Sequence, residues 1–95
     1  MILAVWKNTV IAESDRTIIV EENHYFPPDS IKKEYFEKTN APTVCPWKGM
    51  ASYFNVIVDG EVNKRAAWYY STPSHAASAI KDYVAFWGGV RVIKV

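Results

Sequence analysis

The sequence contains one cysteine, two histidines and only four glycines among its 95 residues. A single cysteine cannot form an intrachain disulfide, and one cysteine with two scattered histidines cannot complete a tetrahedral zinc site. We therefore expect no structural metal and no other cofactor. The chain must fold on its apolar core alone, which is feasible for a domain of this length.

Long apolar segments are also absent. The apolar start Met1–Trp6 is interrupted by Lys7 before the core of a signal peptide can form. No segment approaches the roughly 20 apolar residues that a membrane-spanning helix requires. These absences predict a soluble, cytoplasmic protein that has no membrane partner.

Neither sign of charge dominates the chain. Eleven Lys and Arg residues against ten Asp and Glu residues give a net charge of +1 at pH 7. Proteins that bind nucleic acids or anionic membranes carry strongly basic faces, so this composition disfavours both partners. Hydrophobic residues make up 49% of the chain and aromatic residues 15%. This composition predicts one globular domain over residues 1–95.

The first third of the chain has the pattern of short antiparallel strands. Leu3–Trp6 and Val10–Ala12 flank a turn in which Asn8 can take the left-handed conformation. Arg16–Glu21 is rich in β-branched residues and predicts a third strand. Three strands in so short a span indicate an antiparallel meander.

The strongest strand signal lies in the second half of the chain. Ala51–Val58 predicts a long strand, and the Asp59-Gly60 pair predicts the hairpin turn that follows it. In that strand Phe54, Val56 and Val58 share one face, and Tyr53, Asn55 and Ile57 share the other. Ala66–Tyr70 is the expected return strand, and Val90–Lys94 is an apolar closing strand that we place at a sheet edge.

Two short helices are expected, at about residues 29–37 and 74–83. Asp29 or Ser30 can cap the first, and Ile31 and Tyr35 lie four residues apart on one face. The second is rich in alanine and follows Ser74, a suitable N-cap. The fold class is therefore mainly β with two short helices (α+β).

Motifs distributed over the whole chain support a family assignment. They are Trp6-Lys7-Asn8 with Ile11–Ser14, Tyr25-Phe26-Pro27, Cys45–Gly49 with Ser52-Tyr53, Ala67–Tyr70 with Pro73, and Ile80 with Val84–Phe86. In this order they resemble the DUF427 family, whose function is uncharacterised. The resemblance implies a small antiparallel β-tent or compact barrel-like sheet.

The same resemblance has limits on chemistry. Some naming schemes give the family a nucleotidyltransferase-like label, but the chain has neither the carboxylate arrangement that holds two magnesium ions nor a phosphate-binding glycine loop. Related folds include zinc proteins and methionine sulfoxide reductases of the B type. Their paired Cys-x-x-Cys motifs are absent here, so zinc is not carried over.

The segment around the single cysteine concentrates the chemistry of the chain. A thiol, a cation beside a glycine and several aromatic rings can form a groove for a small anionic or aromatic ligand or for a protein partner. We predict that its ligand-binding residues are Cys45, Trp47, Lys48, Tyr53, Trp68 and Tyr69. The simpler alternatives are a solvated turn lysine and aromatic rings that belong to the core, which we favour for Trp68 and Tyr70.

An enzyme is the alternative hypothesis. Cys45 would be the nucleophile, Lys48 would lower its pKa and His24 would serve as the base. Cysteine is also a common small core residue, so we favour a binding domain without catalysis. The surplus of aromatic residues and the apolar closing strand favour a homodimer over a monomer.

Overall fold

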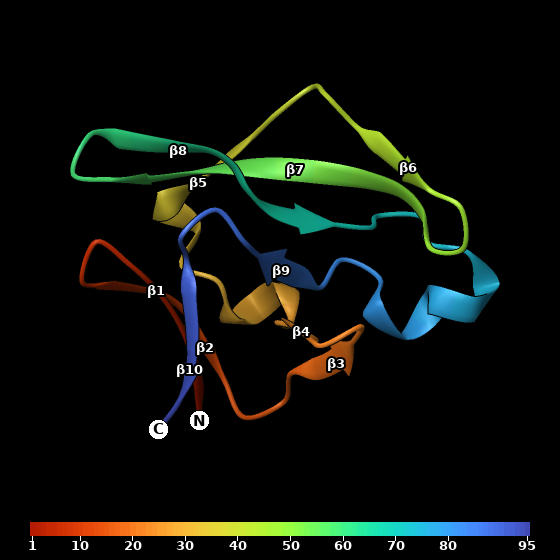
Figure 1. The fold of residues 1–95 in the computed structure, drawn as a ribbon, viewed down its shortest axis with the longest axis horizontal. Helices are drawn as coiled ribbons and strands as arrows, with labels where there is room; N and C mark the ends of the chain where they lie inside the picture. Colours follow the sequence, from red (N-terminus) through yellow and green to blue (C-terminus); the bar gives the residue numbers. More distant parts are fainter.

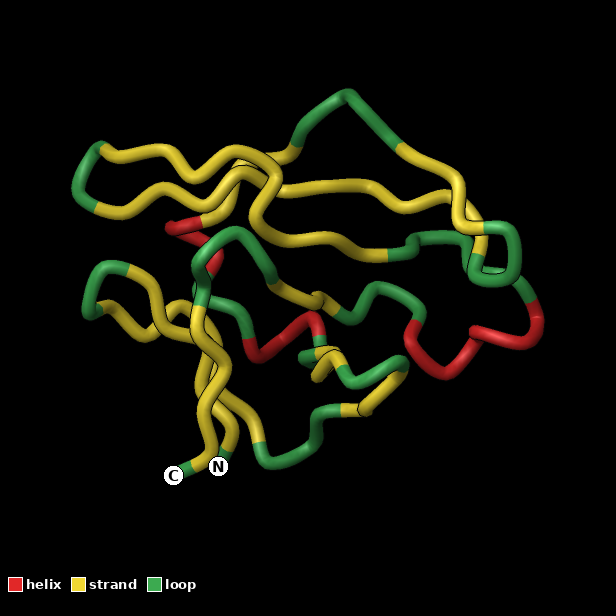
Figure 2. Tube along the Cα trace, in the orientation of Figure 1, coloured by secondary structure: helices red, strands yellow, loops and turns green.

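The computed structural model describes residues 1–95 and consists mainly of antiparallel strands, as the sequence predicts (Figures 1 and 2). Its strands are β1 (Ile2–Trp6), β2 (Thr9–Ser14), β3 (Ile18–Val20), β4 (Asn23–Tyr25), β5 (Phe36–Lys38), β6 (Thr43–Cys45), β7 (Gly49–Val58), β8 (Glu61–Tyr69), β9 (Val84–Phe86) and β10 (Arg91–Lys94). The helical elements are three 3-10 segments: η1 (Pro28–Ser30), η2 (Lys33–Tyr35) and η3 (His75–Ile80).

The strands form three sheets that remain open. β10, β1 and β2 make a three-stranded sheet, β3 and β4 a two-stranded one, and β5, β7, β8 and β9 the largest sheet, with β6 also paired to β7. The long β7–β8 hairpin runs across the upper part of Figure 1, and the chain termini lie side by side at the bottom. No sheet closes on itself, so the expected barrel-like closure is wrong.

Two turns have the geometry that their sequences predict. Lys7 and Asn8 have φ values of 50° and 57°, and Asp59 and Gly60 have values of 52° and 77°. Two consecutive left-handed residues produce a turn whose twist matches the strands on either side. The β1–β2 and β7–β8 hairpins are therefore both confirmed.

The meander is wrong, because β3 does not pair with β2. The backbone N–H of Arg16 donates a hydrogen bond to Ser14 Oγ over 2.9 Å, and this local turn directs the chain away from the first sheet. β3 then pairs with β4. The turn between these strands consists of Glu21 and Glu22, both at positive φ.

The predicted helix at 29–37 is also wrong: the segment contains η1, η2 and the strand β5. Ile31 is extended, with φ −86° and ψ 143°. It forms a bridge with Ala12, and the N–H of Lys32 donates to the carbonyl of Ile11 over 2.8 Å. Pairing with β2 supplies hydrogen bonds that a two-turn helix would otherwise make internally, and so short a helix has little stability of its own.

The second predicted helix, at 74–83, is replaced by η3 alone. Ala77 interrupts it with φ −110° and ψ 15°. Beyond it Lys81 bridges to Tyr70, and the N–H of Asp82 donates to the Tyr70 carbonyl over 2.9 Å. The chain is thus drawn out toward β8, and it continues into β9, a strand that the sequence interpretation missed.

The core consists of two clusters of buried residues that share the strands β7 and β8. Val56, Val58 and Ala67 belong to the first, and Ala51 and Tyr70 belong to the second. Phe54 packs against the first cluster and Tyr53 against the second, so the predicted alternation of faces in β7 is present. Tyr53 and Phe54, successive residues of β7, therefore lie on opposite sides of the sheet.

β10 pairs only with β1 and lies at a sheet edge, as expected. The homodimer that we inferred from this edge remains a prediction. No helix of the fold has the length and apolar character needed to cross a membrane. The cytoplasmic location also remains a prediction.

Candidate functional site

The segment Cys45–Gly49 is a tight turn that joins β6 to β7. Cys45 pairs with Gly49 across its base. Gly49 has φ 111°, and a Cβ atom at this position would lie 3.3 Å from the carbonyl oxygen of Thr72. Ser74 fixes the turn from the same side, because its N–H donates to the Lys48 carbonyl over 2.8 Å and its hydroxyl donates to the Trp47 carbonyl. The glycine is required for both its conformation and this close approach.

Lys48 is buried, with 6% of its surface exposed. Its ammonium group donates a hydrogen bond to Glu21 and forms an ion pair with it. The Nζ atom also lies 5.3 Å from the ring centre of Trp47 and 5.5 Å from that of Tyr70, within the range of cation–π attraction. The reading of Lys48 as a solvated turn residue is therefore wrong.

The charge on Lys48 is stabilised despite burial. Burial alone would lower its pKa. The hydrogen bond to Glu21 outweighs burial and raises the pKa of Lys48 above its usual 10.5, with further contributions from the Glu21 charge and, at the high pH where tyrosines ionise, from Tyr25 and Tyr70. Lys48 is thus a fixed cation at neutral pH and not a neutral amine that could act as a base or nucleophile.

Glu21 reaches Lys48 from the tip of the β3–β4 hairpin. It has φ 51°, a left-handed conformation that glutamate seldom adopts, and its side chain is 56% exposed. The hydrogen bond from Lys48 is the main cause that lowers the pKa of Glu21. A solvated carboxylate on a strained turn therefore supplies the counter-charge for a buried ammonium.

Tyr70 lies beside this pair and is buried, with 4% of its surface exposed. Burial raises the pKa of its hydroxyl to about 12, although the nearby charge of Lys48 acts in the opposite direction. Its ring remains neutral at physiological pH. Tyr70 therefore contributes a polar but uncharged wall next to the cation.

A cavity of about 250 Å³ opens next to Lys48. Its lining combines one cation, Lys48, with the four aromatic rings of Tyr53, Trp68, Tyr70 and Trp87. Thr43 and Ala51 complete the lining. The lining residues come from β6, from the Cys45–Gly49 turn, from β7, from the end of β8 and the residue after it, and from the loop after β9, so residues 44 positions apart meet in one place.

Hydrogen bonds hold three of the four rings in place. The Tyr53 hydroxyl lies 2.7 Å from Thr43 Oγ1, and Trp68 Nε1 donates to the Tyr25 hydroxyl over 3.1 Å. Trp87 Nε1 donates to the carbonyl of Arg65 over 2.6 Å. The Arg65 guanidinium also lies 4.3 Å from the ring centre of Tyr53. These contacts fix the walls of the cavity before any ligand binds.

The structure brings some of the predicted site residues together and separates others. Lys48, Tyr53 and Trp68 line the cavity. Cys45 packs against the second core cluster, and Trp47 is 43% exposed next to Lys48. Tyr69 lies on the other side of the sheet and lines a different cavity.

Sequence interpretation missed Glu21, Thr43 and Trp87 altogether, and it assigned Tyr70 to the core. Tyr70 does belong to the second core cluster, and it also lines the cavity. The only argument that could have led to Glu21 is that a buried lysine requires an acidic partner to balance its charge. Its position in the sequence, 27 residues from Lys48, gives no indication of the partnership.

The groups proposed to activate Cys45 are engaged elsewhere. His24 Nδ1 lies 2.8 Å from the hydroxyl of Thr17, across the start of the β3–β4 hairpin. Lys48 is held by Glu21. No group of three or more His, Cys, Asp or Glu side chains has the arrangement of a metal site.

Comparison with known proteins adds one match. The model of the family described as "Domain of unknown function (DUF427)" matches residues 1–95. No curated protein matches the chain.

Proposed function

Because the chain belongs to the DUF427 family, whose function is unknown, we propose a function from its geometry: it is a binding domain for a small aromatic anion. The ring of the ligand occupies the cavity beside the Cys45–Gly49 turn, and its carboxylate or phosphate pairs with Lys48. The observation that carries this proposal is a buried, permanently charged ammonium at the wall of an aromatic cavity.

Glu21 occupies the position that the ligand's anionic group would take. It is the sole ion-pair partner of Lys48. Because Glu21 is 56% exposed and sits in a left-handed turn, the chain loses little when its carboxylate returns to water. A carboxylate or phosphate on a ligand can therefore replace it, and the buried cation remains paired throughout.

The walls of the cavity define the rest of the ligand. Tyr53, Trp68, Tyr70 and Trp87 present flat aromatic surfaces, and such surfaces attract another ring by offset stacking or edge-to-face contact. At about 250 Å³ the cavity is smaller than typical ligand pockets of about 300–1,000 Å³. One aromatic ring with a single anionic substituent matches this size.

The test uses three probes that differ in one property each. Benzoate has both the ring and the charge, cyclohexanecarboxylate keeps the charge without a planar ring, and benzyl alcohol keeps the ring without the charge. Tryptophan fluorescence and melting temperature are measured for each. We expect benzoate to quench fluorescence and raise the melting temperature, because three of the four tryptophans, Trp47, Trp68 and Trp87, lie at or beside the site.

Two variants separate ligand binding from a purely structural ion pair. Lys48→Met removes the cation and should abolish the response to benzoate. Glu21→Gln removes the competing carboxylate and should strengthen the response. The opposite signs are the signature of competition, since a structural pair would give the same loss from either side. No response to benzoate, or weaker binding by Glu21→Gln, would contradict the proposal.

The enzyme hypothesis has no contact in its favour. His24 and Lys48 are both engaged with other side chains, and Cys45 is a partly buried residue that packs against the second core cluster. We therefore propose binding without catalysis.

A further inference from the structure

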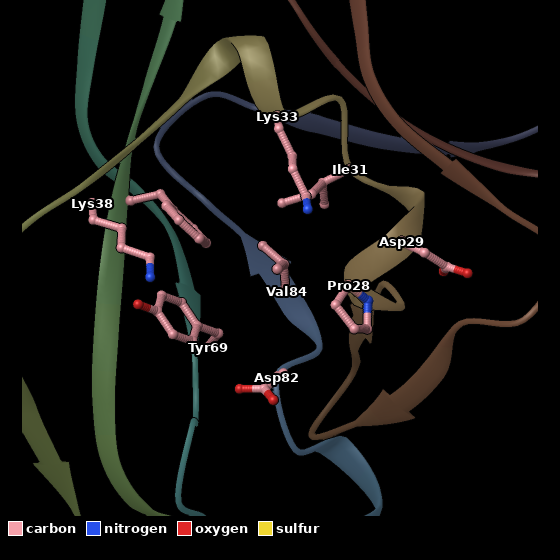
Figure 3. A pocket seen from close by; sticks show the side chains of 9 residues that line it. Pro28, Asp29, Ile31, Lys33, Lys38, Tyr69, Asp82 and Val84 are labelled. Atoms are coloured by element: carbon pink, nitrogen blue, oxygen red, sulfur yellow. The ribbon is translucent and has the colours of Figure 1, made fainter.

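A second cavity lies on the opposite side of the β7–β8 sheet, between that sheet and the segment that contains η1 and η2. Its volume is about 400 Å³, within the range of small-molecule sites. Figure 3 shows the side chains that line it: Pro28, Asp29, Ile31, Lys33, Lys38, Phe54, Tyr69, Asp82 and Val84. It shares no lining residue with the cavity beside Lys48.

The charged groups of this cavity are arranged by sign. In Figure 3, Lys33 and Lys38 reach the cavity from separate directions, above Val84 and beside Tyr69, and Asp82 lies at the opposite, lower end. None of these three charged side chains makes an ion pair, since the four ion pairs of the chain involve other residues. Their charges are therefore available to a ligand.

Asp29 does not belong to this arrangement. Its carboxylate points away from the cavity in Figure 3 and lies 4.0 Å from Arg16. Asp82 is thus the acidic group that faces the cavity interior. Its backbone is fixed, because its N–H donates to the Tyr70 carbonyl over 2.9 Å.

An apolar surface connects the two charged ends. The rings of Phe54 and Tyr69 stack, with centres 4.7 Å apart and planes inclined by 28°. Val84 and Ile31 complete this surface. Val84 belongs to the first core cluster and Phe54 packs against it, so the core of the protein holds this surface in place.

We propose that this cavity binds a small dipolar molecule, with an anionic group at one end, an ammonium group at the other and an apolar body between them. The anionic group lies on the side of the cavity that carries Lys33 and Lys38, the body lies on Tyr69 and Phe54, and the ammonium pairs with Asp82. An ω-amino acid has this chemistry. The site is independent of the aromatic cavity beside Lys48, so either proposal can fail without the other.

Three aliphatic probes test the charge arrangement. 6-Aminohexanoate carries both charges, hexanoate lacks the ammonium and hexylamine lacks the carboxylate. Their dissociation constants are measured from backbone amide NMR shifts. We expect 6-aminohexanoate to bind about fivefold or more tightly than either single-charge probe, with the largest shifts at Tyr69, Asp82 and Val84. Tryptophan fluorescence should not change, because no tryptophan lines this cavity.

Charge-removing variants then assign each end. Asp82→Asn should remove the advantage of 6-aminohexanoate over hexanoate, and the double change Lys33→Gln with Lys38→Gln should remove its advantage over hexylamine. Asn suits position 82 because Asp82 has φ 62°, a conformation that Asn tolerates. Lys32→Gln is the control, since Lys32 is exposed on the same segment but does not line the cavity.

Each outcome decides the proposal. The proposal is supported if 6-aminohexanoate binds more tightly than both single-charge probes and loses each advantage in the variant that removes the corresponding protein charge. Equal affinities for the three probes, equal losses in the Lys32→Gln control, or no shift at Tyr69 up to about 10 mM, near the weakest affinity expected of such a fragment, would overturn it.

Discussion

Trp68 and Tyr69 are neighbours in β8, yet their side chains line cavities on opposite faces of the same sheet. The separation follows from strand geometry, because successive side chains of a strand alternate between its two faces. Each face meets a different part of the fold. Trp68 lies with the Lys48 turn and donates to Tyr25, whereas Tyr69 stacks on Phe54 opposite η1 and η2. One hairpin thereby supplies walls to two sites.

Substitution by alanine should reduce the free energy of unfolding by different amounts at Gly49 and at Gly60. Gly60, with φ 77°, lies close to the left-handed region, where a side chain costs about 1–2 kcal/mol of unfolding free energy, and Gly49, with φ 111°, lies farther outside the regions that side chains allow. At Gly60 nothing lies within 4 Å of the added Cβ, but at Gly49 the carbonyl oxygen of Thr72 lies at 3.3 Å. Gly49→Ala should therefore destabilise the protein more than Gly60→Ala in chemical denaturation. Equal losses would show that neither the contact with Thr72 nor the less favourable φ of Gly49 affects the stability.

The sequence predicts local structure well where the signal itself is local. Asp59-Gly60 specifies its turn through the backbone freedom of two adjacent residues, and the alternation of Phe54, Val56 and Val58 specifies a buried face. The helix at 29–37 was wrong because pairing of Ile31 with Ala12 outweighs the weak local preference. Ala12 lies in β2, too far from Ile31 along the sequence for a local residue pattern to reveal the pairing.

The candidate site shows the same division. Cys45–Gly49 stands out in the sequence because its residue types are chemically distinctive, and Lys48, Tyr53 and Trp68 do line one cavity. Glu21 does not stand out, since one more glutamate in a turn resembles any solvated residue. Its role follows from β3 pairing with β4 and placing the turn beside Lys48. That is a property of the tertiary fold.

Lys48→Met and Lys48→Ala should have different effects on stability. Methionine keeps an apolar stem of similar length, and Glu21, left without a partner, is exposed enough to be solvated. We expect Lys48→Met to change the free energy of unfolding by no more than about 1 kcal/mol. Lys48→Ala also removes buried stem packing and should cost about 2 kcal/mol more. Equal destabilisation in denaturant titrations would mean that the charge, and not the stem, carries the stability.

Acid should weaken the protein through Glu21. Its pKa in the folded state is lowered, so the unfolded state takes up a proton first as the pH falls. The stabilising contribution of the pair is complete above the usual value of 4.5 and is lost as the pH falls from there through the folded-state pKa. Glu21→Gln should therefore show a smaller loss of melting temperature across this acid range than the parent. Parallel acid profiles for the two proteins would count against the pair.

Alkali should weaken the protein through Tyr70. Its pKa rises from 10.0 to about 12 on folding because of burial. Between these values the unfolded state has released the proton that the folded state retains, so folding stability falls as the pH rises. Lys48 acts in the same direction, because its pKa also rises on folding, from 10.5. The part due to Tyr70 is on the order of 2 kcal/mol.

Denaturation midpoints of the parent and of Tyr70→Phe, measured from neutral pH to pH 12, isolate this contribution, because phenylalanine fills the same space and cannot ionise. The stability difference between the two proteins should be constant up to about pH 10 and should then shift in favour of Tyr70→Phe. Tyr35→Phe is the matched control, since Tyr35 packs against the first core cluster, away from Lys48. It should follow the parent throughout. A difference between the parent and Tyr70→Phe that stays constant up to pH 12 would mean that the Tyr70 hydroxyl is solvated, and that the wall of the Lys48 cavity is wetter than its burial indicates.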